Sequence, residues 1–128
     1  MPSPTPQPPQ NDLLESLKKA TQGLLYPSES DEPFEPFLWK PTTNDPAKEV
    51  AAHSKPGAKI REQSVNDFFA ALATAEDAER YAALRRELES KLKDLRVFRV
   101  GEIEVAVYLI GRAPTGDWAG LRTTSIET

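Results

Sequence analysis

The sequence contains no cysteine and only one histidine, His53. Without cysteine, the chain has no disulfide bonds, no thiol nucleophile and no cysteine-based zinc site. A single histidine removes most histidine metal sites, and a Ser-His-Asp triad would have to use His53. The loop "GRAPTG" at 111–116 lacks the lysine and the serine or threonine that follow the second glycine of a phosphate-binding P-loop. These absences argue against most of the common enzyme classes.

Long apolar runs are also absent. No stretch approaches the roughly 18–20 apolar residues that a membrane-spanning helix needs. The first ten residues, "MPSPTPQPPQ", have neither the basic start nor the apolar stretch of a signal peptide. We therefore expect a cytoplasmic protein that has no contact with membranes.

The chain has fewer basic residues than acidic ones. The chain has 16 basic and 20 acidic residues, a net charge of −4 and an isoelectric point near 5.1. Nucleic-acid binding depends on a basic surface that faces the phosphates, so we expect no direct contact with nucleic acid. An acidic protein is instead attracted to a basic protein partner.

Proline is plentiful and uneven. Five of the first nine residues are proline, so residues 1–10 are predicted to be a disordered or polyproline II tail. A ligand for a proline-reading domain is the functional alternative for this tail. The length of 128 residues suits one domain, which we place at residues 11–128.

The first half of that domain predicts one helix, an edge strand and a loop. Asn11 or Asp12 begins the helix, and Gly23 stops it. The prolines in "PFEPFLW" (33–39) permit only an edge strand. Residues 40–62 show no apolar period, which indicates a long surface loop with at most a short strand or turn near Glu49–Ala52.

The second half predicts two helices and a sheet. Ser64 caps a short helix that contains "DFF", and Thr74 caps a long helix over residues 75–95. A hairpin follows, with Gly101-Glu102 at its turn. The strand after it, 103–111, is apolar on both faces and must therefore be covered on both. With a final strand near 121–128, this predicts an α+β fold, a three-layer α-β-α sandwich around a small, mainly antiparallel sheet.

The segment "LYPSESDEPFEPFLW" (25–39) places four carboxylates in an apolar frame: Glu29, Asp31, Glu32 and Glu35. They are compatible with a catalytic carboxylate pair, although such a pair needs a pocket that raises a pKa. Calcium binding is a weaker option, because the glycine of an EF-hand loop is missing. A solvated turn capped by Ser28 and Asp31 is the structural alternative. An acidic contact surface is the fourth.

His53 and Trp118 are two further candidate functional residues. His53 lies in a proline-rich loop with no carboxylate on a helix to orient it, so we expect an exposed histidine rather than a catalytic base. Trp118 lies in a glycine-rich loop, where an exposed tryptophan would anchor a protein interface. Packing of Trp118 on the edge of the sheet is the alternative.

Three stretches together resemble the nuclease A inhibitor family. They are "GLLYPSESDEPFEPFLW" (23–39), "DFF" (67–69) and "VFRVGEIEVAVYLIGRAPTGDWAGLRTTSIET" (97–128). Members of this family are small intracellular proteins that block sugar-non-specific, magnesium-dependent DNA/RNA endonucleases of the ββα-metal type. Their fold is an α-β-α sandwich, as the strand pattern predicts independently.

The resemblance implies a non-catalytic inhibitor that plugs the active site of its partner nuclease. The glutamate of the Ser-Glu-Ser motif, Glu29 between Ser28 and Ser30, would contact the basic region of that site. The last residue, Thr128 after Glu127, would approach the catalytic magnesium of the nuclease through its hydroxyl and terminal carboxylate. The inhibitor would need no cofactor of its own and would be a monomer when free. An interaction module of the same fold with a non-nuclease partner is the alternative function.

Overall fold

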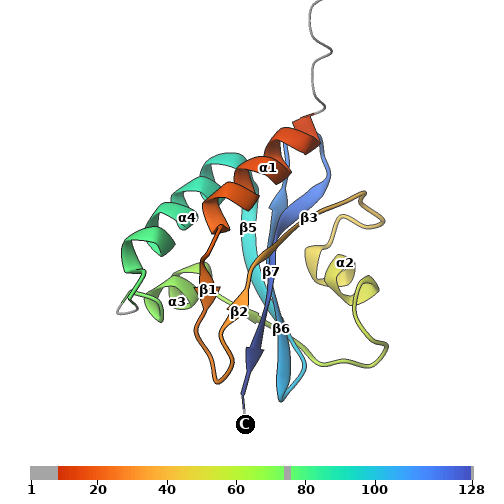
Figure 1. The fold of residues 1–128 in the computed structure, drawn as a ribbon. Helices are drawn as coiled ribbons and strands as arrows, with labels where there is room; N and C mark the ends of the chain where they lie inside the picture. Colours follow the sequence, from red (N-terminus) through yellow and green to blue (C-terminus); the bar gives the residue numbers. More distant parts are fainter. Residues whose placement is uncertain (1–8, 74–75, 128) are drawn as a thin grey trace, which may run out of the picture.

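The computed structural model describes residues 9–73 and 76–127 (Figure 1). Its helices are α1 (Pro9–Thr21), α2 (Pro46–Ala52), α3 (Val65–Ala70) and α4 (Ala78–Lys91). Its strands are β1 (Leu25–Tyr26), β2 (Glu32–Pro33), β3 (Glu35–Trp39), β4 (Ile60–Gln63), β5 (Lys93–Val100), β6 (Glu104–Arg112) and β7 (Trp118–Ile126).

The strands form one main sheet and one small hairpin. The main sheet has five strands in the order β3-β7-β6-β5-β4, and all neighbours are antiparallel. Strands β1 and β2 pair separately as a two-stranded hairpin. The predicted α+β class with an antiparallel sheet is confirmed. Strand β3 lies at the edge, where Pro36 removes a backbone donor without breaking a central ladder.

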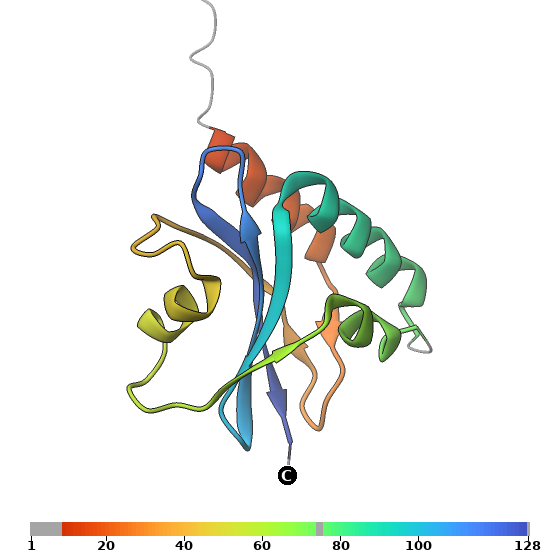
Figure 2. The ribbon, with the colours of Figure 1, turned by 180° about the vertical axis from the view of Figure 1, so that it is seen from behind.

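Helices cover both faces of the main sheet. Figure 2 shows α2 on one side and α1, α3 and α4 on the other. Strand β6 supplies both cores by alternation: Val107 and Leu109 pack toward the three helices, whereas Tyr108 and Ile110 pack toward α2. Each fully buried side chain of this size stabilises the fold by about 1.5–3 kcal/mol. The three-layer sandwich predicted from the two apolar faces of this strand is therefore confirmed.

The predicted long loop at 40–62 was wrong, because it contains helix α2 and strand β4. Asp45 caps α2 by accepting a hydrogen bond from the backbone N–H of Ala47 at 2.9 Å. Pro46 takes the first helical position, where its missing N–H costs nothing. Val50, at 0% exposure, then anchors the helix on the sheet.

A fully buried carboxylate fixes α2 to the loop before it. Glu49 accepts hydrogen bonds from the backbone N–H and the hydroxyl of Thr42, at 2.7 and 3.1 Å, and from the N–H of Thr43 at 3.3 Å. Because buried polar groups need partners, these bonds offset the burial of the carboxylate. Thr42 and Thr43 lie in the loop before α2, so the spacing of apolar residues within the helix could not predict these hydrogen bonds.

Two predicted helix boundaries were displaced. Helix α1 begins at Pro9 rather than at Asn11 or Asp12, and proline is well suited to a first helical turn. The remaining part of the predicted tail, residues 1–8, lies outside the described residues, as does the predicted cap Thr74. Helix α4 ends at Lys91 rather than 95, since Leu92 is extended.

Two predicted local signals are confirmed. The Ser64 side chain caps α3 by accepting a hydrogen bond from the Asp67 N–H at 3.0 Å. Gly101 opens the β5–β6 turn with φ of 107°, and a Cβ there would lie 2.7 Å from the Glu104 carbonyl oxygen. Only glycine fits that position.

None of the helices in residues 9–73 and 76–127 is both long enough and apolar enough to cross a membrane.

Tyr81 joins α4 to the first hairpin. Its ring is buried, with 2% exposure, and its hydroxyl donates a hydrogen bond to the Leu25 carbonyl. Burial is the main cause that raises the pKa of Tyr81 to about 12, and the neighbouring Asp77 carboxylate adds to it. The neutral phenol is therefore part of the folded state.

We expect the free energy of unfolding to fall as the pH rises from about 10 to about 12, because the unfolded chain ionises Tyr81 near 10. The contribution of Tyr81 is complete below pH 10 and is lost through pH 12. It amounts to at most about 2.7 kcal/mol. Denaturant titrations across this range should give a shallower pH slope for Tyr81→Phe than for the wild type. Equal pH slopes for Tyr81→Phe and the wild type would show that ionisation of Tyr81 does not cause the loss of stability at high pH.

Candidate functional site

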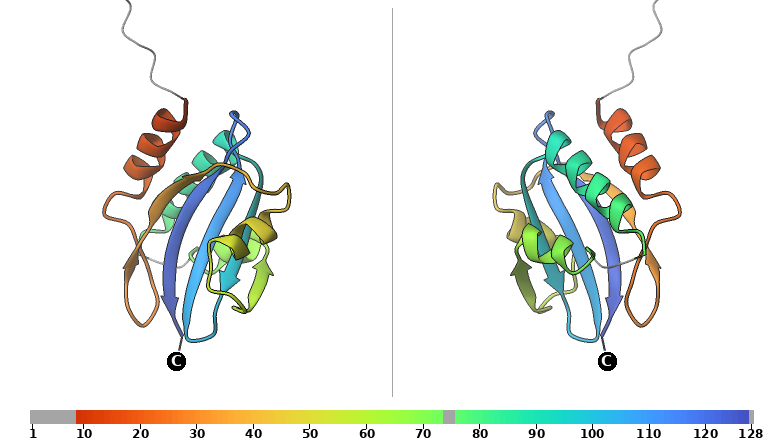
Figure 3. Two further views of the ribbon diagram at one scale, coloured as in Figure 1. Left: turned by 90° about the vertical axis from the view of Figure 1, so that its right-hand side faces the viewer. Right: turned by 90° about the vertical axis from the view of Figure 1, so that its left-hand side faces the viewer.

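Three segments far apart in the sequence meet at one end of the molecule. They are the β1–β2 turn (27–31), the β5–β6 turn (101–103) and the end of β7 (126–127), which together we term the tip. Figures 1 and 3 show the described chain ending between the two turns. Two hydrogen bonds join them: Glu127 N–H donates to the Ile103 carbonyl at 2.8 Å, and Ile126 N–H donates to Ser28 Oγ at 3.2 Å.

Ser28 organises the tip. Its hydroxyl donates to the Ser30 carbonyl at 2.6 Å and accepts from the Ser30 N–H at 3.3 Å, in addition to the bond from Ile126. The predicted pairing of Ser28 with Asp31 is replaced by this tighter turn. Glu29 therefore lies between two residues that are bonded to each other, on a turn attached to the end of the chain.

The β1–β2 hairpin carries three of the four acidic groups of the sequence motif, and the fourth, Glu35, begins β3. Glu29, Asp31 and Glu35 are exposed, and Glu32 is half-buried and accepts a hydrogen bond from Ser30 Oγ at 3.3 Å. Thr123 of β7 anchors the hairpin to the main sheet, because its hydroxyl donates to the Pro33 carbonyl at 3.0 Å. The carboxylates are thus displayed from an anchored element rather than from a loose loop.

Glu127 has a partner within the protein. Its carboxylate forms an ion pair with Arg99 and accepts a hydrogen bond from Ser125 Oγ at 2.8 Å. Arg99 comes from β5, so the ion pair fixes the exit of β7 to the neighbouring hairpin. Glu127, the last residue that the structure describes, is therefore held by contacts to β5 and β7. Thr128, which the resemblance implicates in metal contact, lies outside the described residues.

Trp118 does not belong to this site. It was predicted to lie in a loop, but it starts β7 and is only 3% exposed. Its indole N–H donates to the Thr43 carbonyl at 3.0 Å, and the Arg112 guanidinium covers its ring at 3.9 Å. Eight residue steps along β7 separate it from Ile126, or roughly 26 Å. The expectation of an exposed anchor at Trp118 was wrong, since the tertiary contacts bury it.

Ile103 was missed by sequence reasoning. It was assigned to a strand because it continues the apolar run, yet it lies in the β5–β6 turn with 64% of its surface exposed. Among the described residues, only Leu25 is another large apolar side chain with such exposure. Turns favour small and polar residues. An isoleucine directly after the Gly-Glu turn could therefore have indicated an exposed apolar contact residue.

His53 is exposed, as predicted, but it does have a carboxylate neighbour. It ends α2, and its ring stacks on Trp39 with centroids 3.6 Å apart. Its Nε2 lies 3.6 Å from the buried Glu49 carboxylate. The prediction of no helical carboxylate near His53 was therefore wrong, and both of its neighbours are part of the packing around α2.

The described residues contain no group of three or more His, Asp or Glu side chains placed to hold a metal ion. The geometry of the tip instead suits a contact surface: an acidic turn, an exposed isoleucine and the end of a chain, all held by hydrogen bonds. Such pre-organised polar groups lose little conformational freedom on binding.

A family model described as "nuclease A inhibitor-like protein" matches residues 11–128. The chain belongs to this family. The match covers nearly the whole chain and confirms the resemblance that the sequence motifs indicated. A comparison with curated proteins gave no match. Membership of the nuclease A inhibitor-like family indicates a nuclease-inhibitor role, a nuclease as partner and a non-catalytic protein.

We expect Ser28→Ala to loosen the tip, because it removes three hydrogen bonds, including the one from β7. The amide of Ile126 should lose protection in hydrogen exchange, and the free energy of unfolding should fall by about 1 kcal/mol. Ser90→Ala is a matched control, since the Ser90 hydroxyl donates to the Glu87 carbonyl within α4 and the variant therefore removes a hydrogen bond inside one helix. An unchanged rate of hydrogen exchange at the Ile126 amide would show that Ser28 does not hold the end of β7.

Proposed function

We propose that this protein inhibits a sugar-non-specific, magnesium-dependent nuclease by inserting its tip into the nuclease active site. The observation that carries the proposal is the hydrogen bond between Ser28 Oγ and Ile126 N–H, at 3.2 Å. It holds the Glu29 turn beside the end of the chain, although the two bonded residues are 98 positions apart in sequence. The acidic turn and the last described residues of the chain thereby share one surface.

Glu29 would take the place of a substrate phosphate. A nuclease of this class binds the negative charge of DNA and RNA, so its active-site region is basic. A carboxylate on an anchored turn offers that region a fixed negative partner. The neighbouring carboxylates of the hairpin would strengthen the long-range attraction and speed association.

The end of the chain would reach the metal of the nuclease. Thr128 follows Glu127 by one peptide bond, and Glu127 is held by Arg99 and Ser125. A hydroxyl and a terminal carboxylate supply oxygen, the ligand type that Mg²⁺ prefers, and Mg²⁺ commonly retains waters that bridge to such groups. We assign this metal to the nuclease. Ile103 would add an apolar contact beside the polar ones.

The direct test is digestion of DNA by a ββα-metal nuclease with and without this protein. With inhibition established, we expect Glu29→Gln to weaken it by roughly tenfold to a hundredfold, the usual cost of losing one charged partner in an interface. The inhibition constant should also depend less on salt concentration, because one charge pair is lost.

Glu15→Gln is the control for the loss of net charge. Glu15 is exposed on α1. Figure 1 shows α1 away from the tip, so neutralisation of Glu15 should leave the inhibition constant nearly unchanged. If Glu29→Gln inhibited as strongly as Glu15→Gln, with the same salt dependence, Glu29 would have no specific role.

A short Gly-Ser extension after Thr128 tests the second contact. We expect it to weaken inhibition strongly, because it moves the terminal carboxylate away and adds bulk where the chain would enter the nuclease. The same extension placed before Met1 serves as the control, and circular dichroism checks that both proteins are folded. Full inhibition by the C-terminally extended protein would refute the metal-directed role of Thr128.

A further inference from the structure

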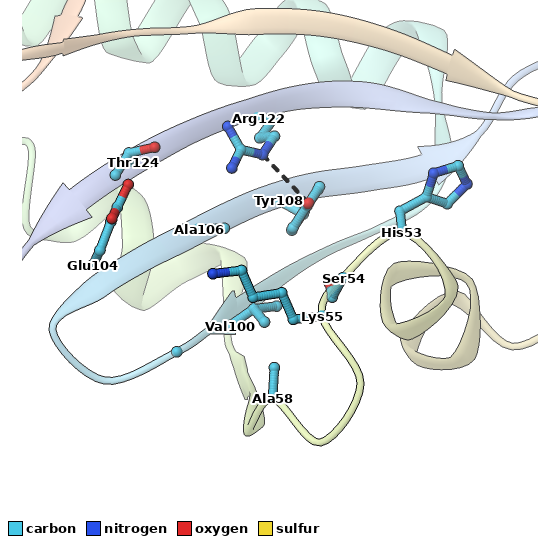
Figure 4. Close-up of a pocket in the computed structure, with 11 residues that line it drawn as sticks. His53, Ser54, Lys55, Ala58, Val100, Glu104, Ala106, Tyr108, Arg122 and Thr124 are labelled. Carbon is cyan, nitrogen blue, oxygen red and sulfur yellow. Dashed lines mark hydrogen bonds between the residues drawn. The ribbon is translucent and has the colours of Figure 1, made fainter.

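A pocket of about 270 Å³ opens on the α2 side of the main sheet (Figure 4). The loop after α2 forms one wall, and strands β6 and β7 form the other. Its apolar surface comes from Ala58, Val100 and Ala106. The acidic β1–β2 hairpin lies on the other side of the sheet, where Tyr26 stacks on Phe68 of α3, so the pocket is separate from that hairpin.

Two cations reach the pocket from opposite walls. Figure 4 shows Lys55 extending from the loop and Arg122 projecting from β7. In the part of the chain that the structure describes, neither forms an ion pair with a carboxylate. Glu104 is the single carboxylate among the lining residues, so the cations outnumber it.

The Arg122 guanidinium is held in place. Its Nε donates to the Tyr108 hydroxyl at 3.3 Å, and its central carbon lies 5.7 Å from the Tyr108 ring centroid. Tyr108 is itself buried, at 4% exposure, and therefore provides a rigid support. The bond uses Nε, which leaves the two terminal nitrogens to point at a ligand. A planar guanidinium in this arrangement suits a carboxylate or a phosphate.

The charge of the pocket is opposite to that of the whole chain, which is −4. Glu35 of β3 lies opposite Arg122 in the sheet, and Glu104 lines the pocket, but among the described residues neither carboxylate forms an ion pair with Lys55 or Arg122. Leaving the two cations unpaired above an apolar floor creates a local positive field in a concave site, where it is screened less than on an open surface.

We propose that this pocket binds a small organic anion, a carboxylate or a phosphate monoester that carries a flat apolar body. The anionic head lies between Lys55 and Arg122, with the Thr124 hydroxyl beside it as a further donor. The apolar body rests on Ala58, Val100 and Ala106. The volume falls just below the usual range for ligand pockets, roughly 300–1,000 Å³, so the body is no larger than about one aromatic ring.

Titration of the full-length ¹⁵N-labelled protein, followed by NMR, tests the proposal with four probes at constant pH and ionic strength. Phenyl phosphate and benzoate represent the two anion types, benzyl alcohol is the neutral counterpart, and inorganic phosphate lacks the apolar body. We expect saturable shifts of the Val100, Ala106 and Thr124 amides with at least one of the first two probes. Benzyl alcohol and inorganic phosphate should bind at least about tenfold more weakly.

Variants distinguish specific binding in the pocket from nonspecific attraction of anions to surface lysines. Arg122→Gln should weaken binding about tenfold, and Lys55→Gln, in an exposed loop, about threefold or more. Lys48→Gln is the matched control, because Lys48 is exposed on α2 and does not line the pocket. It should leave the dissociation constant unchanged.

Three results of the probe titrations would overturn the proposal, and one result from the variants would also do so. The three titration results are the absence of saturable shifts with both organic anions, equal binding of the neutral probe, and equal binding of inorganic phosphate. Unchanged binding in Lys55→Gln would do so as well, since this variant removes a loop charge without touching the Tyr108 support. Binding of phenyl phosphate but not benzoate would identify a phosphate monoester as the ligand, and the reverse would identify a carboxylate.

Discussion

The pairing of β6 with β7 is the interaction on which the rest of the fold depends. Nine consecutive residue pairs join the two strands, from Glu104 opposite Ile126 to Arg112 opposite Trp118. Each strand also has a second neighbour, so both are central, and both are buried on their two faces. A sheet centre of this kind requires helices on each side, which is why α2 stands opposite α1, α3 and α4.

That pairing also brings the last described residues of the chain, Ile126 and Glu127, to the tip. Chain ends usually fray, because few contacts hold them. Here β7 carries the end out of the sheet centre, and the last described residues are bonded to Ser28, to the Ile103 carbonyl and to Arg99. An end fixed in this way can act as a binding element, since little of its conformational entropy remains to be lost.

Each side of the sheet carries one charged feature that rests on aromatic side chains. On the side of three helices, the first hairpin displays carboxylates and is anchored through Tyr26, Phe34 and Tyr81. On the α2 side, Lys55 and Arg122 line a concave surface supported by Tyr108. Aromatic side chains thus provide the rigid support in both places, while the charged groups they support differ in sign.

The layered fold, the β5–β6 hairpin and the cap at Ser64 could be predicted from the amino-acid sequence alone. These features follow from alternation and from bonds between residues a few positions apart, which a linear pattern records. The acidic turn and the family motifs were likewise visible as contiguous residues.

Features that depend on partners far apart in the chain became visible in the folded structure. Helix α2 depends on the bonds from Thr42 and Thr43 to a buried Glu49 and on the packing of Val50 against the sheet. Trp118 is buried because Thr43 and Arg112 enclose it, and Ser28 acts through Ile126, 98 residues away. Local sequence carries no record of such partners, because the chain brings them together only after the sheet has formed.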